Sequence, residues 1–169
     1  MGAVTLARSG QAQDAQKLAD EVNRDHPLDD AIQSNWLPSI TAAANLPAEP
    51  QVGIRRLELA RPYELGDVSF TTEMFGRLYP VYMRGLCYLQ ARQAQQAAAE
   101  FQKILDHRGI VGNFIIGALA HLQLGRAQAM MGDRAAARKS YQEFLALWKD
   151  ADPDIPIYRQ AKTEYVKLQ

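Results

Sequence analysis

The chain lacks several features that mark specialised classes of protein. Its 169 residues contain a single cysteine, Cys87, so no disulfide can form within the chain and no cysteine cluster can hold a metal ion. Lysine plus arginine and aspartate plus glutamate both number 19, which gives a formal net charge of zero. Because nucleic-acid-binding domains usually carry a basic excess or stripe, the composition argues against a nucleic-acid partner.

Long apolar runs are also missing. No run approaches the roughly 20 residues needed to cross a bilayer, so we expect no direct membrane contact. The first residues form neither a basic start nor the apolar core of a signal peptide. The localisation stays unknown, and both the cytoplasm and an extracytoplasmic domain of a membrane-anchored parent protein are open.

Recognisable catalytic motifs are absent as well. The sequence contains no GxSxG motif and no glycine loop that could cradle a phosphate. His26, His107 and His121 show no i, i+4 pairing that would suggest zinc ligands. We therefore expect no metal, no cofactor and no enzymatic activity in this chain.

What the sequence does contain is a succession of helix-forming segments. Ala, Leu, Gln, Glu, Lys and Arg fill most of the chain, and no segment alternates with a period of two. Ala97, Phe101 and Ile104 are spaced as one apolar helix face, and Ala137, Tyr141 and Phe144 repeat that pattern. The pattern predicts an all-α fold of about eight helices.

Two short stretches share the same spacing of glycine and alanine. Gly10 is followed five residues later by Ala15, and Gly132 is followed in the same way by Ala137. A glycine can reverse the chain at positive φ, and an alanine lets two helices cross closely. Each stretch therefore predicts an antiparallel helix hairpin, with Asp133 as N-cap of the second helix.

A hairpin of this kind cannot bury its own apolar faces, so it must stack on a neighbour. The turn signals divide the chain, as one domain of residues 1–169, into hairpin units and a final helix. The predicted units are roughly residues 3–27, 31–61, 78–108 and 114–149, with a capping helix at 156–168.

This arrangement resembles the tetratricopeptide repeat family, whose motif places Leu-Gly, Tyr, Ala, Phe and Pro over about 34 positions. "LQLGRAQAMMGDRAAARKSY" and "VYMRGLCYLQARQAQQAAAEF" carry the clearest matches. The resemblance implies stacked hairpins in a right-handed superhelix. The positions assigned to the repeat are Ala15, Gly53, Gly85, Tyr88, Ala97, Phe101, Gly125, Gly132, Ala137 and Tyr141.

The C-terminal part also looks like the tetratricopeptide tail of large bacterial Ser/Thr protein kinases and related winged-helix regulators. "AEFQKILDHRGIV" and the sequence from "GALAHLQLG" onward carry this likeness. It implies a signalling role, as a sensor or interaction module, attached to a catalytic or DNA-binding domain. The chain itself has no kinase motif, since "HRG" at 107–109 lacks the aspartate of a catalytic loop.

The resemblance further implies that the first helix of each hairpin lines a concave face that binds a peptide or a partner protein. Tyr82 and Leu86 stand where acid-clamping relatives have polar residues, which favours an apolar or aromatic-rich ligand over a bare C-terminal carboxylate. The candidate contact residues are Asn35, Asn45, Tyr79, Tyr82, Leu86, Gln90, Leu122, Arg126 and Met130.

An alternative function is structural. The array could be a spacer, or a homodimerisation module that pairs through an uncapped N-terminal end bearing Val4, Leu6 and Ala7.

Overall fold

Every regular element of the described chain is a helix. The structure, a computed structural model, describes residues 2–66 and 78–169. Besides a π-helix, η1 (Ile32–Trp36), and a 3-10 helix, η2 (Glu58–Tyr63), it contains ten α-helices in these ranges. They are α1 (Gly2–Arg8), α2 (Ala12–Asp25), α3 (Leu37–Asn45), α4 (Pro50–Leu57), α6 (Tyr79–Gln90), α7 (Ala94–Asp106), α8 (Arg108–Val111), α9 (Ile116–Met130), α10 (Arg134–Leu147) and α11 (Pro156–Val166).

The hairpin turns at the two glycines have the geometry expected from the sequence. Gly10 and Gly132 have φ angles of 88° and 83°, which an L side chain adopts only with strain. The amide of Gly132 donates to the carbonyl of Ala129 (3.0 Å), and the next amide donates to the carbonyl of Gln128 (3.0 Å). The Asp133 carboxylate then accepts a hydrogen bond from the amide of Ala136 (3.0 Å), which caps α10.

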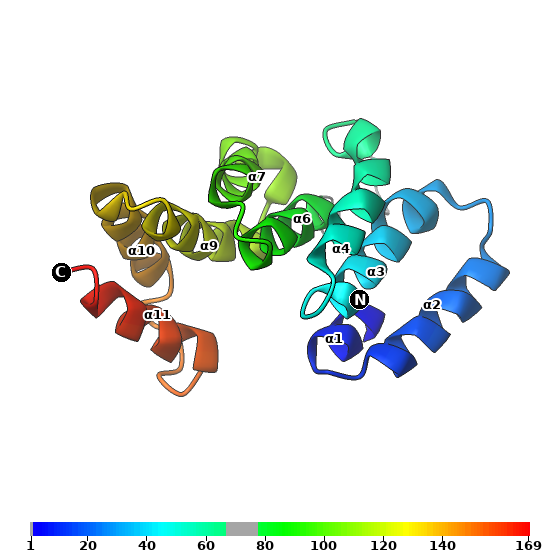
Figure 1. The fold of residues 1–169 in the computed structure, drawn as a ribbon, viewed down its shortest axis with the longest axis horizontal. Helices are drawn as coiled ribbons and strands as arrows, with labels where there is room; N and C mark the ends of the chain where they lie inside the picture. Colours follow the sequence, from blue (N-terminus) through cyan, green and yellow to red (C-terminus); the bar gives the residue numbers. More distant parts are fainter. Residues whose placement is uncertain (1, 67–77) are drawn as a thin grey trace.

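The helices stack in series. Within hairpins, α1 packs on α2, α3 on α4, α6 on α7 and α9 on α10. Between hairpins, α2 packs on α3, α4 on α6, α7 on α9 and α10 on α11. Figure 1 shows α9, α6 and α4 following one another across the molecule, with α11 and the α1–α2 pair on the same side at opposite ends. The predicted all-helical, solenoid-like fold is confirmed, and α8 is an extra turn in the α7–α9 connection.

Small residues let the helices approach closely. Ala15, Ala97 and Ala137 have no exposed surface. A Cβ built on Gly85 would lie 2.6 Å from the Phe101 ring, and one built on Gly125 would lie 2.8 Å from the Tyr141 ring. Since glycine has no side chain, each aromatic ring packs directly on the backbone of the preceding helix. The same pairing recurs in two successive hairpins.

The second hairpin begins irregularly. The amide of Leu37 donates to the carbonyl of Ile32, five residues back, which gives the π-turn of η1. Pro38 lies at the beginning of α3, and the helical run continues without a break from η1 into α3, since Trp36 and Leu37 both keep αR backbone angles.

The structure shows the surroundings of Cys87 and of the N-terminal helix α1. Cys87 is buried, and burial raises the pKa of its thiol to about 12, which fits a small apolar core residue. Val4 and Ala7 are also buried, while Leu6 packs partly buried against the core. The expectation that Val4 and Ala7 form an exposed N-terminal face is therefore wrong, because α1 packs against α2 and α3.

Candidate functional site

A groove of about 720 Å³ lies where α6, α9 and α11 face one another. Helices α6 and α9 are the first helices of two successive hairpins, and α11 is the final helix. In Figure 1, α11 lies on one side of the row that α9 and α6 form. The C-terminal end of α3 and the α6–α7 turn complete its rim. The lining residues are Leu46, Leu86, Leu89, Gln90, Arg92, Gln123, Arg126, Met130, Gln160 and Glu164.

Helical spacing places these side chains in rows. Leu86 and Gln90 lie one turn apart on α6, and Arg126 and Met130 lie one turn apart on α9. The Gln90 amide also donates to the carbonyl of Pro47 (3.4 Å), which links α6 to the α3–α4 turn of the second hairpin. The groove therefore presents apolar side chains between polar ones. Its walls come from the second, third and fourth hairpins and from α11.

The polar wall is organised by one ion pair. The Arg126 guanidinium donates to both Glu164 oxygens (Nε–Oε2 2.8 Å, Nη2–Oε1 2.9 Å), and the Tyr141 hydroxyl donates to the same carboxylate (2.7 Å). Burial alone would lower the pKa of Arg126, but the bond to Glu164 outweighs it and raises that pKa. Arg126 and Glu164 therefore satisfy each other and join α9 to α11.

Four of the nine predicted contact residues line this groove: Leu86, Gln90, Arg126 and Met130. They belong to the C-terminal halves of α6 and α9. The structure thus brings together residues that lie about 40 positions apart in the sequence, as expected for equivalent places in two stacked hairpins.

The residues predicted in the N-terminal halves of the same helices are not accessible. Tyr82 and Leu122 have no exposed surface, and Tyr79 is 8% exposed. The Tyr82 ring packs edge-on against Phe101 (5.9 Å between centroids), and its hydroxyl accepts a hydrogen bond from the Gln123 amide (3.4 Å). The prediction that these three residues face a partner is wrong, because this part of each first helix is enclosed by its own hairpin and by the next one.

The two predicted asparagines lie apart from the groove. Asn35 is 9% exposed within η1, and its side-chain oxygen has no hydrogen-bond partner among the described residues. The Asn45 amide donates to the carbonyl of Thr41 in its own helix (2.8 Å). Neither side chain lines the groove that the other candidates share.

The remaining lining residues were missed from the sequence. Gln123, Gln160 and Glu164 come from positions whose face could be assigned only once the packing of α11 was known. Arg92 follows α6 and lies in the turn itself, outside the helical register used for the prediction. Its spacing of five residues before Ala97, like that of Gly132 before Ala137, was a signal that could have located this turn.

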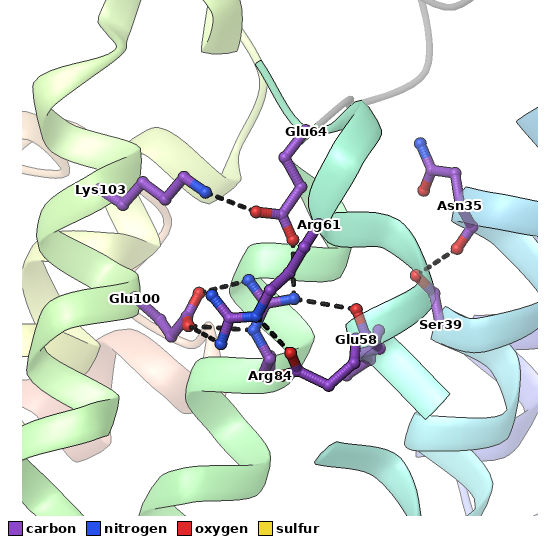
Figure 2. Close-up of polar contacts among 9 residues, drawn as sticks. Asn35, Ser39, Glu58, Arg61, Glu64, Arg84, Glu100 and Lys103 are labelled. Atoms are coloured by element: carbon purple, nitrogen blue, oxygen red, sulfur yellow. Dashed lines mark hydrogen bonds and ion pairs between the residues drawn. The ribbon is translucent and has the colours of Figure 1, made fainter. Parts of the chain in front are cut away.

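A second polar cluster, also missed from the sequence, surrounds the buried Arg84 (Figure 2). The fully buried Arg84 guanidinium on α6 contacts Glu64 (2.7 Å), Glu100 (2.7 and 3.0 Å) and the carbonyl of Leu57 (3.0 Å). Lys103 binds the other Glu64 oxygen (2.5 Å), and Arg61 bridges Glu58 and Glu100. The three positive and three negative charges of the cluster neutralise one another. We therefore interpret the cluster as a structural contact that holds η2, α6 and α7 together.

The cluster predicts acid sensitivity. Burial alone would raise the pKa of Glu64, but the hydrogen bonds with Arg84 and Lys103 outweigh it and lower that pKa below its ordinary value. The stabilisation is therefore complete above the unfolded-state pKa, about 4.3, and is lost as the pH falls through the lower folded-state pKa. Urea unfolding from about pH 7 to about pH 3 should show a falling free energy of unfolding below about pH 4.5.

Glu64→Gln provides the control for this prediction. The variant should be less stable than the wild type at neutral pH, because a neutral amide replaces one carboxylate of the ion cluster. Its free energy of unfolding should also fall less steeply with acid. Equal acid dependence in both proteins would contradict the assignment to Glu64.

The described ranges contain no helix that is long and apolar enough to cross a membrane, and no group of three potential metal-ligating side chains.

No curated protein and no solved structure matches the chain. The tetratricopeptide repeat family matches residues 81–107 and 119–151, which hold most of the α6–α7 and α9–α10 hairpins. These two hairpins are therefore similar to tetratricopeptide repeats.

Proposed function

We propose that this chain is a non-catalytic interaction module that binds a segment of a partner protein in the groove between α6, α9 and α11. Tetratricopeptide repeats generally mediate protein–protein interaction, and the two matched hairpins supply most of the groove. The observation that carries the proposal is the lining itself. Leu86, Leu89 and Met130 present apolar surface beside amide and guanidinium groups, a mixture that suits a protein segment.

The size and walls of the groove support the same proposal. Its volume of about 720 Å³ is open to solvent and extends over elements from successive hairpins. An extended or helical segment could therefore contact several elements at once, which is how stacked helical arrays use their concave surfaces. A signalling role beside a bacterial kinase or winged-helix regulator stays a prediction from the sequence likeness.

A second hollow of about 520 Å³ provides a matched control surface. It lies between the α7–α9 connection and the end of α10, and it includes Leu147, which is 53% exposed. This hollow is formed mainly by one hairpin and its entry loop, so it offers a shorter contact line than the groove. Leu147→Glu therefore introduces the same charge as a groove substitution, away from the groove.

Selection of random peptides on the purified protein tests the proposal. Peptides enriched on the wild type should bind Leu86→Glu and Met130→Glu at least about tenfold more weakly, a loss of about 1.4 kcal/mol. They should bind Leu147→Glu as tightly as the wild type. Failure to enrich any peptide, or equal binding to Leu86→Glu with its fold intact by circular dichroism, would rule the proposal out.

The alternative proposal, a spacer or homodimerisation module, gives a different result. Light scattering during size-exclusion chromatography would then show a dimer, and groove substitutions would not change it.

A further inference from the structure

We propose that Arg92 is a specificity residue of the groove, and that the segment bound there carries an acidic side chain next to its apolar ones. This inference rests on the proposed function and names the chemistry of the partner. It starts from the geometry of three equivalent turns.

The three turns share one hydrogen-bond pattern. In the α1–α2 turn, the amide of Gly10 donates three residues back, to Ala7 (3.3 Å), and the next amide donates five residues back from itself, to Leu6 (2.9 Å). The α9–α10 turn repeats this pattern around Gly132, and the α6–α7 turn repeats it around Arg92, whose amide donates to Leu89 (3.0 Å). All three are the glycine-type end of a helix, with the central residue in the left-handed region.

Arg92 is the exception among them. Its φ is 61°, and it is the only non-glycine residue with positive φ in the described ranges. Glycine occupies the same place in the other two turns, where this conformation carries no Cβ clash. A long side chain at this place is strained, and strained residues persist where their side chain has a use.

The position of Arg92 indicates that use. Arg92 is exposed and lines the groove, whereas neither Gly10 nor Gly132 does. The other groove cation, Arg126, is held on two nitrogens by Glu164. Among the described residues Arg92 has no ion-pair partner, so its guanidinium is the available charge at this rim.

The recognised chemistry follows from the guanidinium. Arginine binds a carboxylate through paired hydrogen bonds, and the nearby Leu86 and Leu89 offer apolar contact. An aspartate or glutamate beside apolar residues in a protein segment would satisfy both. Because Arg92 is exposed, we expect a modest preference, about two- to fivefold, that weakens as salt screens the charge.

The test compares peptides selected on the wild type with those selected on Arg92→Gly. The probe is a random peptide library displayed on phage, followed by each enriched peptide and its Asp→Asn or Glu→Gln derivative in fluorescence polarisation. Wild-type peptides should be enriched in acidic residues and lose about two- to fivefold in affinity when neutralised. Peptides selected on Arg92→Gly should show neither effect.

Stability separates this role from a structural one. Arg92→Gly removes the strain while keeping the turn, so its Tm should rise by about 2–4 °C even as the acidic preference is lost. Gly132→Arg is the matched control: it places arginine in the equivalent turn away from the groove, and should lower Tm without changing peptide affinity.

The failures are distinguishable. If no peptide is enriched on the wild type, the proposed function fails and this inference fails with it. If peptides are enriched without acidic residues, or if the acidic preference survives in Arg92→Gly, the role of Arg92 is refuted while the groove remains a binding site.

Discussion

Arg84→Met is expected to lower the free energy of unfolding by about 3–5 kcal/mol. The substitution keeps an unbranched side chain of similar length in α6 but removes the charge that Glu64 and Glu100 share. Both carboxylates would stay buried with fewer partners, and an unpaired buried charge is far costlier than a paired one. Burial alone would lower the pKa of Arg84, yet the two carboxylates raise it, so the wild-type guanidinium stays charged at any ordinary pH.

Urea unfolding followed by circular dichroism measures this effect. Arg55→Met is the control, since Arg55 is exposed on α4 and its loss should change stability by less than about 0.5 kcal/mol. Adding Glu64→Gln and Glu100→Gln to Arg84→Met should restore part of the lost stability, because the unpaired charges are then gone. A loss below about 1 kcal/mol for Arg84→Met would contradict the buried ion cluster.

Tyr82→Ala is the second large effect, with an expected loss of about 3–5 kcal/mol. The Tyr82 ring is fully buried against Phe101 and Tyr79, with centroids 5.9 and 6.1 Å away. Its removal leaves a cavity between α6, α7 and α9 that the packed helices cannot close. Although Tyr82 is a candidate contact residue by sequence, its burial means that this substitution should weaken the fold itself.

Two further tyrosine variants isolate the cause. Tyr63→Ala makes the same change at a residue that is 57% exposed, and should alter the free energy of unfolding by less than about 0.5 kcal/mol. Tyr82→Phe keeps the ring and loses only a hydroxyl that accepts a 3.4 Å hydrogen bond, so its cost should stay below about 1 kcal/mol. Equal losses for Tyr82→Ala and Tyr63→Ala in urea unfolding would disprove the burial argument.

These two residues also explain where a partner can bind. Arg84 and Tyr82 anchor the N-terminal half of α6 in the interior, which leaves Leu86 and Gln90 in its C-terminal half to face the groove. Functional tests should therefore use groove substitutions such as Leu86→Glu. Substitutions at Tyr82 or Leu122 would reduce binding indirectly, through loss of the folded state.

The fold could be predicted because its signals are local. Gly10 and Gly132 favour a reversal by their own conformational freedom, Asp133 caps the helix that it precedes, and the spacing of Ala97, Phe101 and Ile104 places one apolar face on one helix. Such interactions join residues a few positions apart, so the pattern of a single segment contains them. Stacking then follows because no hairpin can bury its apolar face alone.

The site was predictable only in part. The resemblance to tetratricopeptide repeats placed Leu86, Gln90, Arg126 and Met130 on one surface, but it also proposed Tyr82 and Leu122, which are buried. The helical register repeats every turn, so it cannot tell where along α6 and α9 the neighbouring helices cover the surface. That depends on how the helices pack, through close contacts such as Gly85 of α6 with Phe101 of α7, which no single segment contains.

The sequence by itself determined the helices, the hairpin turns and the need to stack, since these depend on backbone preference and apolar spacing within short segments. Only the tertiary structure decided which charges are buried and which line the groove. Arg84 is joined to Glu64 and Glu100 from two other elements, and Arg126 to Glu164 from α11, while Arg92 keeps its guanidinium available. The physical reason is that an ion pair depends on distance in space, and chains of equal composition can bring different charges together.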